Sequence, residues 1–436
     1  MIKLILIFSF FCSALSAASR PNIIFIFADD WGFGDLAIHG HPELKTPHLD
    51  KMAAEGTDFY HFKVNSGVCS PSRTALMTGN FPAVHRIHRH FPEKAKLAEA
   101  WGMPLWLDNK VTLLPRLLQQ SGYKTAHYGK WHLTNRPFKN APLPISYGYD
   151  DAKCFNDQLD DWEDIEANES HLLADMLVNK SIDFIKKTEG KPFFINLWLH
   201  ESHTPIHATD EMRKVYPGVQ EPQLTYYAAL TNADKQLGRL FAFLKKQGLE
   251  ENTLVVFSSD NGPASASDVK KRATYYSRGV TAGRKGRKAS IMEGGVNVPF
   301  IVKWPGKVPA GKVDKQKVFS AVDMLPTFCS LAGVELPANY KSDGEDVSPI
   351  LRGESFVKKK AIFWDWRKGS KKGDFWPEQA IADGPWKLYA RDSFKRVELY
   401  NIIEDPFEQN NLYKKKLDLS KSLVDKLKTW CATLPK

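Results

Sequence analysis

Cysteine is scarce in this chain, and its scarcity limits what can hold the fold together. Five cysteines occur among the 436 residues, at positions 12, 69, 154, 329 and 431. Small secreted proteins that depend on disulfide bridges contain a much larger share of cysteine. If Cys12 is lost with a leader peptide and Cys69 has chemistry of its own, at most one bridge can form. A hydrophobic core must therefore provide most of the stability, and 43% of the residues are hydrophobic.

Long apolar runs are missing beyond the first few residues. Lys3 precedes an apolar stretch at residues 4–11, and small residues follow at 14–18, which is the pattern of a secretory signal peptide. No later stretch approaches the roughly 18 apolar residues that a membrane-spanning helix needs. We therefore expect residues 1–18 to be a signal peptide, and the mature protein to be exported, periplasmic or secreted, with no membrane span.

A nucleic-acid-binding motif is also missing, although the formal net charge is +10. Much of the positive charge lies in three lysine runs at residues 358–360, 371–372 and 414–416. Runs of this kind are usually solvated surface, and the alternative is attraction of a polyanionic partner. Because no nucleic-acid motif lies beside them, we expect no nucleic-acid partner.

Short β-branched or aromatic runs alternate with amphipathic stretches along much of the chain. The runs typical of strands are residues 22–28, 124–128, 192–199, 253–258 and 298–303. The stretches with helical periodicity are residues 113–120, 171–187 and 226–246. This alternation predicts an α/β fold in which helices cover both faces of a mostly parallel sheet.

The pattern changes near residue 358. After a helix-like stretch at 347–351, the sequence predicts short strands at 361–366, 378–382, 386–389 and 397–400, followed by a helix at 420–431. We therefore expect a large α/β domain over residues 19–357 and a small antiparallel sheet with a helix over residues 358–436. Two other segments stand out: an acidic, loop-like one at 157–169 and a long connection at 81–106 that is rich in His, Arg, Pro and Trp.

Residues 69–73 read Cys-Ser-Pro-Ser-Arg, and they form the most informative motif of the sequence. Ser70 is predicted to cap a helix whose first turn contains Pro71, which places Cys69 ahead of the helix at the positive end of its dipole. Such a position favours chemistry on an anion. Two plainer interpretations are a chance cysteine in a loop and an ordinary thiolate nucleophile, which would need a nearby histidine as base.

Polar side chains follow four of the predicted strands, and the carboxyl ends of parallel strands meet at one edge of a sheet. These residues are Asp29 and Asp30, Lys130 and His132, His200 and His203, and Asp260 and Asn261. Each pair alone could consist of helix caps or of merely hydrogen-bonded histidines. Together with Cys69, the four pairs predict a functional site at this edge.

Asp29, Asp30, Asp260 and Asn261 offer only oxygen ligands, with no histidine or cysteine in either pair. Such a set favours Ca²⁺ or Mg²⁺ over Zn²⁺. A divalent ion here would neutralise an oxygen of a bound sulfate or phosphate. The alternative is that the acids are only caps and turn formers.

With these motifs the chain resembles the formylglycine-dependent, or type I, sulfatases of the alkaline-phosphatase superfamily, from Pro21 to at least Leu412. Besides residues 69–73, the resemblance rests on Asp29-Asp30-Trp31-Gly32, Gly129-Lys130-Trp131-His132, His203-Thr204-Pro205, Asp260-Asn261-Gly262, and Lys288 ahead of Glu293-Gly294-Gly295. It continues through Trp304-Pro305-Gly306 to Glu398-Leu399-Tyr400-Asn401, Asp405-Pro406 and Asn411-Leu412.

The resemblance implies an alkaline-phosphatase-like fold and a sulfuric ester hydrolase. It implies that a maturation enzyme reads Cys-x-Pro-x-Arg and oxidises Cys69 to formylglycine. The hydrated aldehyde offers two hydroxyls on one carbon, so that one attacks sulfur and the other later expels sulfate. It also implies Ca²⁺ bound by Asp29, Asp30, Asp260, Asn261 and position 69.

The resemblance further implies roles for the basic residues. Arg73 and Lys130 would hold the diol, and Lys130, His203 and Lys288 would bind the sulfate group. His203, with Lys288 as a further candidate, would protonate the leaving alcohol, and His132 would be the base that releases sulfate from the enzyme. His200 is the neighbour of His203 and the weaker candidate, because Thr204-Pro205 follows His203.

The implied substrate is a sulfated polysaccharide or oligosaccharide, because an exported, positively charged protein suits a sulfated polymer. Residues 68–79 and 203–208 most resemble sulfatases that act on galactose or N-acetylgalactosamine 6-sulfate. The connection at 81–106 either packs on itself as an exposed loop or contacts the sugar and its anionic groups. The residues suited to such contacts are His85, Arg86, His88, Arg89, His90, Trp101 and Trp106.

Two alternative functions remain open at this point. A phosphonate or phosphodiester hydrolase of the same superfamily can share the Cys-x-Pro-x-Arg element, but those enzymes tend to have histidine where this chain has Asn261. A carbohydrate-binding relative without turnover would be expected to have lost one or more catalytic residues. All five are present: Cys69, Lys130, His132, His203 and Lys288.

Overall fold

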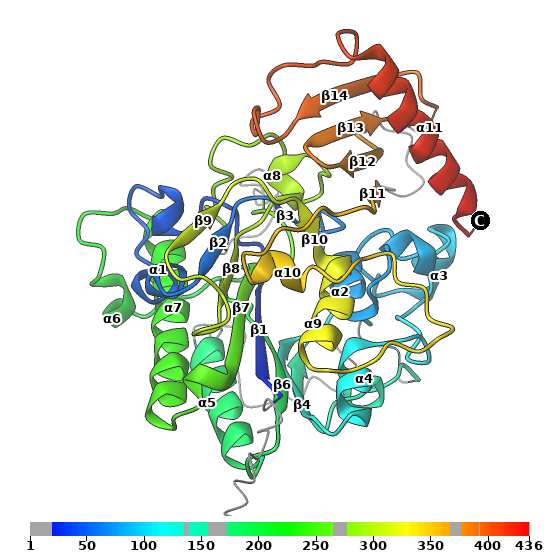
Figure 1. The fold of residues 1–436 in the computed structure, drawn as a ribbon. Coiled ribbons are helices and arrows are strands. Elements are labelled where there is room, and N and C mark those ends of the chain that lie inside the picture. Colours follow the sequence, from blue (N-terminus) through cyan, green and yellow to red (C-terminus); the bar gives the residue numbers. More distant parts are fainter. Residues whose placement is uncertain are drawn as a thin grey trace, which may run out of the picture.

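One large sheet lies at the centre of the structure, a computed structural model that describes residues 20–134, 138, 140–155, 172–264, 277–366, 376–391 and 393–435. Its strand order is β5-β4-β6-β1-β7-β8-β2-β9 (Figure 1). The pairs from β5 to β7 are parallel, and of these eight strands β8 alone runs antiparallel to its neighbours. The bounds are β1 (Asn22–Ala28), β2 (Thr57–Phe59), β4 (Lys124–Lys130), β5 (Asp151–Phe155), β6 (Phe193–Trp198), β7 (Thr253–Ser259), β8 (Phe300–Lys303) and β9 (Lys312–Asp314).

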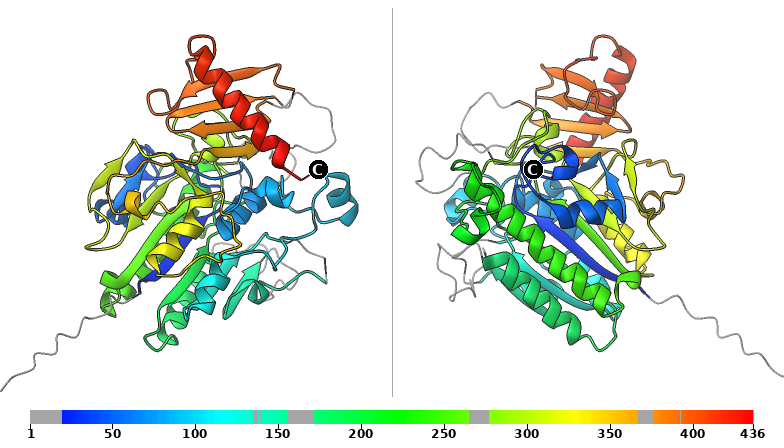
Figure 2. Two further views of the ribbon diagram at one scale, coloured as in Figure 1. Left: turned by 45° about the vertical axis from the view of Figure 1, so that its right-hand side comes forward. Right: turned by 90° about the vertical axis from the view of Figure 1, so that its left-hand side faces the viewer.

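The two faces of this sheet are buried under different helices, and β1 shows the alternation that allows it. Ile23, Phe25 and Phe27 belong to one hydrophobic cluster, whereas Ile24 and Ile26 belong to another, because successive side chains of a strand point to opposite faces. The first face is covered by α2 (Cys69–Thr78), α4 (Leu114–Gln120) and α9 (Met324–Leu331). The second is covered by α1 (Pro47–Ala54), α5 (Leu173–Lys186) and α7 (Gln223–Lys246), as Figure 1 and Figure 2 show.

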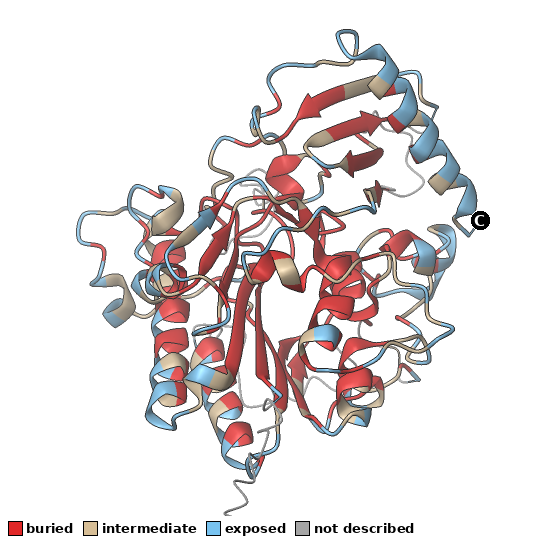
Figure 3. Cartoon of the chain, in the orientation of Figure 1, coloured by how far each residue is buried: buried red, intermediate tan, exposed pale blue. Residues whose placement is uncertain are grey.

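The predicted α/β class, with helices on both faces of a mostly parallel sheet, is confirmed. The central strands are buried almost throughout (Figure 3). Predicted element ends differ from the observed ones by at most three residues. One difference affects the site: β4 continues to Lys130, which pairs with Phe155, so Lys130 ends the strand instead of following it.

A second, antiparallel sheet of four strands follows near the C-terminus. Leu423 and Leu427 of α11 (Leu417–Thr433) pack with Ile381 and Leu388 on one of its faces, and Figure 2 shows the helix lying across the sheet. Trp364 on its first strand belongs to the core of the larger part. The strands are β11 (Ile362–Asp365), β12 (Gln379–Asp383), β13 (Trp386–Ala390) and β14 (Val397–Asn401).

The remaining α-helices and strands of the described residues are short. They are β3 (Phe62–Lys63), β10 (Phe319–Ser320), α3 (Ala95–Ala100), α6 (Asp210–Arg213), α8 (Glu293–Val296) and α10 (Ser348–Leu351). None of the described helices has the length and apolar character needed to cross a membrane. The predicted signal peptide, the acidic segment 157–169 and the lysine pair at 371–372 lie outside the described residues. The division of the chain after residue 357 stays a prediction.

A buried ionic network joins the small sheet to the larger part of the molecule. Lys63 contacts one carboxylate oxygen of Glu293, and Lys387 of β13 lies 2.8 Å from the other. All three side chains are fully buried. Burial alone would raise the pKa of Glu293, but Lys387 and Lys63 hold it well below its ordinary value. The Glu293 backbone NH also donates to Glu408, whose other carboxylate oxygen accepts from Tyr389.

Lys387→Met should lower the free energy of unfolding by about 3–5 kcal/mol, because it removes one of the two cations that compensate a buried carboxylate. Lys415→Met changes an exposed lysine in the same way and should alter stability by less than about 0.5 kcal/mol. Urea denaturation of both variants measures the difference. Equally small losses would show that Lys387 contributes little to joining the two parts.

Candidate active site

Four neighbouring parallel strands, in the order β4-β6-β1-β7, end at the same edge of the central sheet. Each ends in or leads into polar side chains, and most of these are buried. They are Lys130 and His132 at β4, His200 and His203 beyond β6, Asp29 and Asp30 beyond β1, and Asp260 and Asn261 beyond β7. The structure therefore brings every residue of the four predicted pairs to one edge.

Cys69 reaches this edge on α2, and here the predicted helix start is wrong. α2 begins at Cys69 itself, after the extended N-cap residue Val68 (φ −143°). The Val68 carbonyl accepts the first helical hydrogen bond, from the Ser72 backbone NH. Ser70 lies inside the first turn, and its hydroxyl accepts a hydrogen bond from the Phe91 backbone NH at 3.3 Å. Cys69 still lies at the helix N-terminus, and it is 3% exposed.

Arg73, one helical turn after Cys69, is fully buried and links α2 to two strand ends. Its Nε and Nη2 donate to Oδ2 of Asp260 at 3.0 and 2.6 Å, and its Nη1 donates to the Lys130 carbonyl at 3.0 Å. The guanidinium carbon lies 5.6 Å from the ring centroid of Phe27 and 4.7 Å from that of Trp198. Rings and carboxylate together compensate the burial of this charge.

Two lysines pair with the aspartates of β1. Lys130 Nζ lies 2.6 Å from Asp29 Oδ2 and donates to the Cys69 sulfur at 3.4 Å. Lys288 Nζ lies 2.6 Å from Asp30 Oδ2. Burial would lower the pKa of Lys288, but Asp30, Cys69 and Asp29 raise it above the ordinary value. Asp29 likewise raises the pKa of Lys130 against the effect of burial, so both lysines are positively charged beside Cys69 at neutral pH.

The segment that carries Lys288 packs against the loops that carry the other groups. The Lys288 backbone NH donates to the Pro263 carbonyl at 3.0 Å, and the next NH, of Ala289, donates to the Gly67 carbonyl at 2.7 Å. Gly67 lies two residues before Cys69, and Pro263 lies two residues after Asn261. These backbone bonds fix the position of Lys288 relative to both loops.

The glycines of the Glu-Gly-Gly motif permit this close packing. A Cβ on Gly262 would lie 1.9 Å from the Gly294 carbonyl oxygen, and a Cβ on Gly294 would lie 2.3 Å from that of Gly286. The Gly262 backbone NH donates to the Gly295 carbonyl at 2.9 Å. The three segments approach so closely that only residues without a side chain fit.

The oxygen atoms at the ends of β1 and β7 fit a hard dication. Asp29 Oδ1 and Asn261 Oδ1 are buried and have no hydrogen-bond partner within the described part of the chain. Asn261 instead donates from its amide nitrogen to Asp30 at 2.6 Å. The ligand atoms of Asp29, Cys69 and Asp260 lie within 4.8 Å of one another. Carboxylate and amide oxygens of this kind are typical ligands of Ca²⁺ and Mg²⁺.

Crowding of the carboxylates affects the pKa of Asp260. Burial, together with Asp29 and Asp30, raises the pKa of this carboxyl to about 6, although Arg73 and Lys130 oppose the shift. Lys130 and Lys288 contact the other two aspartates. A bound dication would stabilise all three carboxylates in their ionised form.

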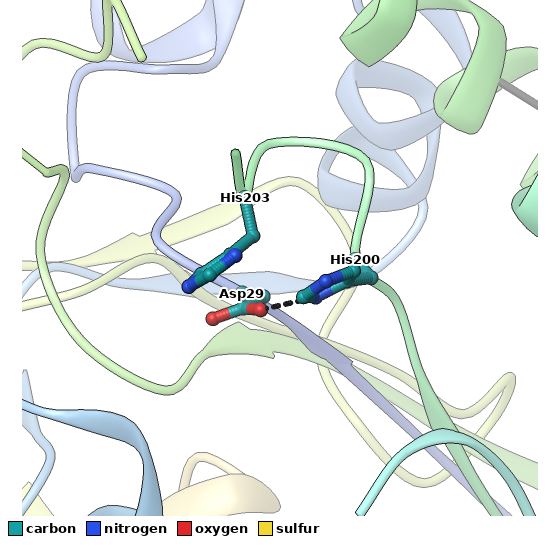
Figure 4. A group of neighbouring side chains, drawn as sticks. All are labelled: Asp29, His200 and His203. Atoms are coloured by element: carbon teal, nitrogen blue, oxygen red, sulfur yellow. Dashed lines mark hydrogen bonds and ion pairs between the residues drawn. The ribbon is translucent and has the colours of Figure 1, made fainter. Parts of the chain in front are cut away.

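His200 and His203 lie beside Asp29, as Figure 4 shows. His200 Nδ1 is hydrogen-bonded to Asp29 Oδ2 at 2.5 Å, and the rings of His200 and His203 stack with centroids 4.6 Å apart. His203 Nδ1 donates to the Thr204 carbonyl at 2.9 Å. The Nε2 atom of neutral His203 therefore carries no proton and can accept or exchange one. Asp29, His200 and His203 are close enough to hold a metal ion, but hydrogen bonds already involve both Nδ1 atoms.

Burial and nearby cations keep the site histidines neutral. Burial, Lys130 and Lys288 hold the pKa of His203 well below its ordinary value, and burial and Lys130 do the same to His132. Burial also raises the pKa of the Cys69 thiol to about 11. An unmodified thiol is therefore protonated at neutral pH, which argues against the ordinary thiolate nucleophile.

Two histidines contact residues of the site in a way that the sequence did not indicate. His200 is bonded directly to Asp29, whereas its spacing marked it only as a neighbour of His203. His90, from the connection at 81–106, has its ring centroid 6.4 Å from that of His132. The density of His, Arg and Trp in that connection was the only signal for it.

Comparisons with known proteins agree with this geometry. The sequence profile of the Sulfatase family matches residues 21–334, and that of N-sulphoglucosamine sulphohydrolase, C-terminal, matches residues 287–433. N-acetylgalactosamine-6-sulfatase of Canis lupus familiaris is 30% identical over 91% of this chain and 82% of its own length. Arylsulfatase A of Bos taurus is 33% identical, and the match covers 92% of this chain and 85% of that protein. The crystal structure of Ps i-CgsB in complex with k-i-k-neocarrahexaose has a TM-score of 0.78 and 26% identity, and covers 94% of this chain and 93% of that one.

The matched regions contain the whole site described above. Every site residue from Asp29 to Lys288 lies inside the Sulfatase match, and the small antiparallel sheet lies inside the second match. On this evidence the protein is a sulfatase and belongs to the type I sulfatase family of the alkaline-phosphatase superfamily.

Proposed function

We propose that this sulfatase removes sulfate from sulfated polysaccharides or oligosaccharides, using formylglycine at position 69 and Ca²⁺. The main observation that supports this proposal is the position of Cys69. Its sulfur accepts a hydrogen bond from Lys130 and lies within 4.8 Å of ligand atoms of Asp29 and Asp260. A nucleophile between a lysine and a candidate cation site can meet an anionic ester that both positive charges attract. The predicted leader would take the enzyme out of the cytoplasm.

Formylglycine would provide a better nucleophile than the unmodified Cys69 side chain and a route for releasing sulfate. The Cys69 thiol is protonated at neutral pH. A serine at this position would attack sulfur once and then be left as a stable sulfate ester. A hydrated aldehyde supplies one hydroxyl to attack sulfur and a second to expel sulfate. Arg73 and Lys130 would hold this diol, and a maturation enzyme acting on Cys-x-Pro-x-Arg would supply the aldehyde.

Asp29, Asp30, Asp260 and Asn261 would hold the Ca²⁺, together with the modified side chain at position 69. The ion would supply positive charge to an oxygen of the bound ester. Two buried oxygens of this set have no hydrogen-bond partner among the described residues, which supports the assignment.

Lys130, Lys288 and His203 would bind the sulfate group of the substrate. The two lysines now contact aspartates, and they lower the pKa of His203. The negative charge of a bound ester would oppose that effect and favour a protonated His203, the form needed to donate a proton to the leaving alcohol. His132, kept neutral by burial and Lys130, has the protonation state of a base.

The sugar we propose is a galactose-type unit sulfated at position 6. The relative from Canis lupus familiaris bears the name N-acetylgalactosamine-6-sulfatase, and the similarity at residues 68–79 and 203–208 favours the same class. The phosphonate or phosphodiester alternative is weaker, because the metal set has Asn261 where histidine would be expected. A binding protein without turnover is weaker still, because the residues that we propose for catalysis lie close together at one edge of the sheet.

Protein produced with its maturation enzyme should carry an aldehyde in place of the thiol at position 69, which peptide mass analysis detects. Cys69→Ala should abolish turnover and leave the unfolding midpoint nearly unchanged, because it removes the nucleophile and little core volume. Cys329→Ala, in the core far along the chain, is the control and should keep turnover. Active protein with an unmodified Cys69 would contradict the proposed nucleophile.

The purified mature enzyme should contain one Ca²⁺ per chain by elemental analysis. Asp260→Asn keeps an acceptor for Arg73 but removes one ligand charge, so it should bind Ca²⁺ more weakly and lose activity at low calcium. Asp210→Asn, at an exposed position, should do neither. Stoichiometric zinc, or full activity of Asp260→Asn after exhaustive chelation, would overturn the metal assignment.

Replacing His203 and replacing His132 should impair different steps of the reaction. His203→Ala should slow cleavage of sugar sulfates by about 10²- to 10⁴-fold and spare an activated aryl sulfate, whose phenolate leaves with little protonation. In His132→Ala, the peptide containing position 69 should retain the mass of a sulfate group. Equal losses of His203→Ala on both substrate types, with no retained sulfate in His132→Ala, would mean that the roles are wrong and that His200 or Lys288 is the next candidate acid.

A further inference from the structure

Part of the connection between α2 and β4 is fixed beside the nucleophile. The Phe91 backbone NH donates to the hydroxyl of Ser70, the residue after Cys69. Ile87 and Phe91 are fully buried in the core cluster that also contains α2 side chains. Arg89 and His90, which lie between these two anchors, therefore have a defined position close to Cys69.

His90 is exposed but lies next to the catalytic groups. Its ring centroid is 6.4 Å from that of His132 and 6.1 Å from that of Trp101. Partial burial and the charges of Arg89, Lys288 and Lys130 lower the pKa of His90 to about 4. A neutral imidazole both donates and accepts hydrogen bonds, which suits a sugar hydroxyl.

Arg89 has no anionic partner within the described part of the chain. Its guanidinium carbon lies 3.7 Å from the Trp101 ring centroid, and its Nε is buried without a hydrogen-bond partner. Arg352 and Arg396, by contrast, pair with nearby glutamates. A guanidinium that lies over an aromatic ring, with a buried Nε that has no partner among the described residues, is available to bind a carboxylate or sulfate.

We propose that Arg89, His90 and Trp101 form a subsite for the sugar unit next to the sulfate ester, and that Arg89 binds an anionic group on that unit. The His90 ring lies between those of His132 and Trp101 in this chain of contacts, so the subsite joins the proposed catalytic residues at His132. His90 hydrogen-bonds a hydroxyl, and the anion is a uronate or a second sulfate. The inference rests on the proposed sulfatase function and defines a further part of its substrate.

Steady-state kinetics of Arg89→Gln test the subsite with four substrates: 4-nitrophenyl sulfate, and three 6-sulfated galactose-type disaccharides whose second unit is neutral, a uronate or sulfated. KM for an anionic disaccharide should rise about 10- to 100-fold with kcat nearly unchanged, because a hydrogen-bonded ion pair is lost. Arg89→Lys keeps the charge and should recover part of the affinity. Arg239→Gln changes an exposed arginine of α7 that pairs with Asp175, and as the control it should leave KM and kcat unchanged.

The substrates separate the possible outcomes. A loss confined to the uronate or to the second sulfate supports the subsite and identifies the anion. An equal loss on the neutral disaccharide overturns the pairing of Arg89 with an anion, and an equal loss on 4-nitrophenyl sulfate overturns the subsite. If the wild-type enzyme cleaves the disaccharides and Arg89→Gln is unaffected, only the subsite is wrong. If the wild type cleaves no sugar sulfate, the proposed function itself is wrong.

Discussion

Compensation of buried charge at the carboxyl edge of the sheet is the interaction on which the rest of the structure depends. Three aspartates at the ends of β1 and β7 are buried together, and their mutual repulsion and loss of hydration would be costly without cations. Arg73, Lys130 and Lys288 provide them from three separate parts of the chain. Each cation thereby fixes its own segment to the strand ends, and Cys69 lies between them.

The small antiparallel sheet is tied into the same arrangement. Glu293 follows Lys288 by five residues, and its carboxylate is held by Lys63 and by Lys387 of β13. Glu408, beyond β14, accepts a hydrogen bond from the Glu293 backbone. The segment that delivers Lys288 to the site is thus held at one end by the C-terminal sheet. This sheet can therefore influence catalysis through the position of Lys288.

The sequence predicted what depends on local periodicity and on chain direction. The strands could be located because hydrophobic runs are local signals, and their polar ends converge because neighbouring parallel strands finish at one edge. The start of α2 could not be predicted: Ser70 has the chemistry of an N-cap, but its hydroxyl is used by Phe91, a partner distant in sequence. The hydrogen bond from His200 to Asp29 joins the ends of two strands that are far apart in the sequence. The spacing of residues along the chain therefore could not predict it.

The central claim is that this edge of the sheet cleaves sulfate esters of sugars only after Cys69 has been modified. Ion chromatography of the sulfate released from a 6-sulfated galactose-type oligosaccharide tests it most directly, with protein made in the presence and in the absence of the maturation enzyme. Only the matured protein should release inorganic sulfate and leave the desulfated sugar. Equal release by protein with an unmodified Cys69, or cleavage of a phosphonate ester with no release of sulfate, would contradict the claim.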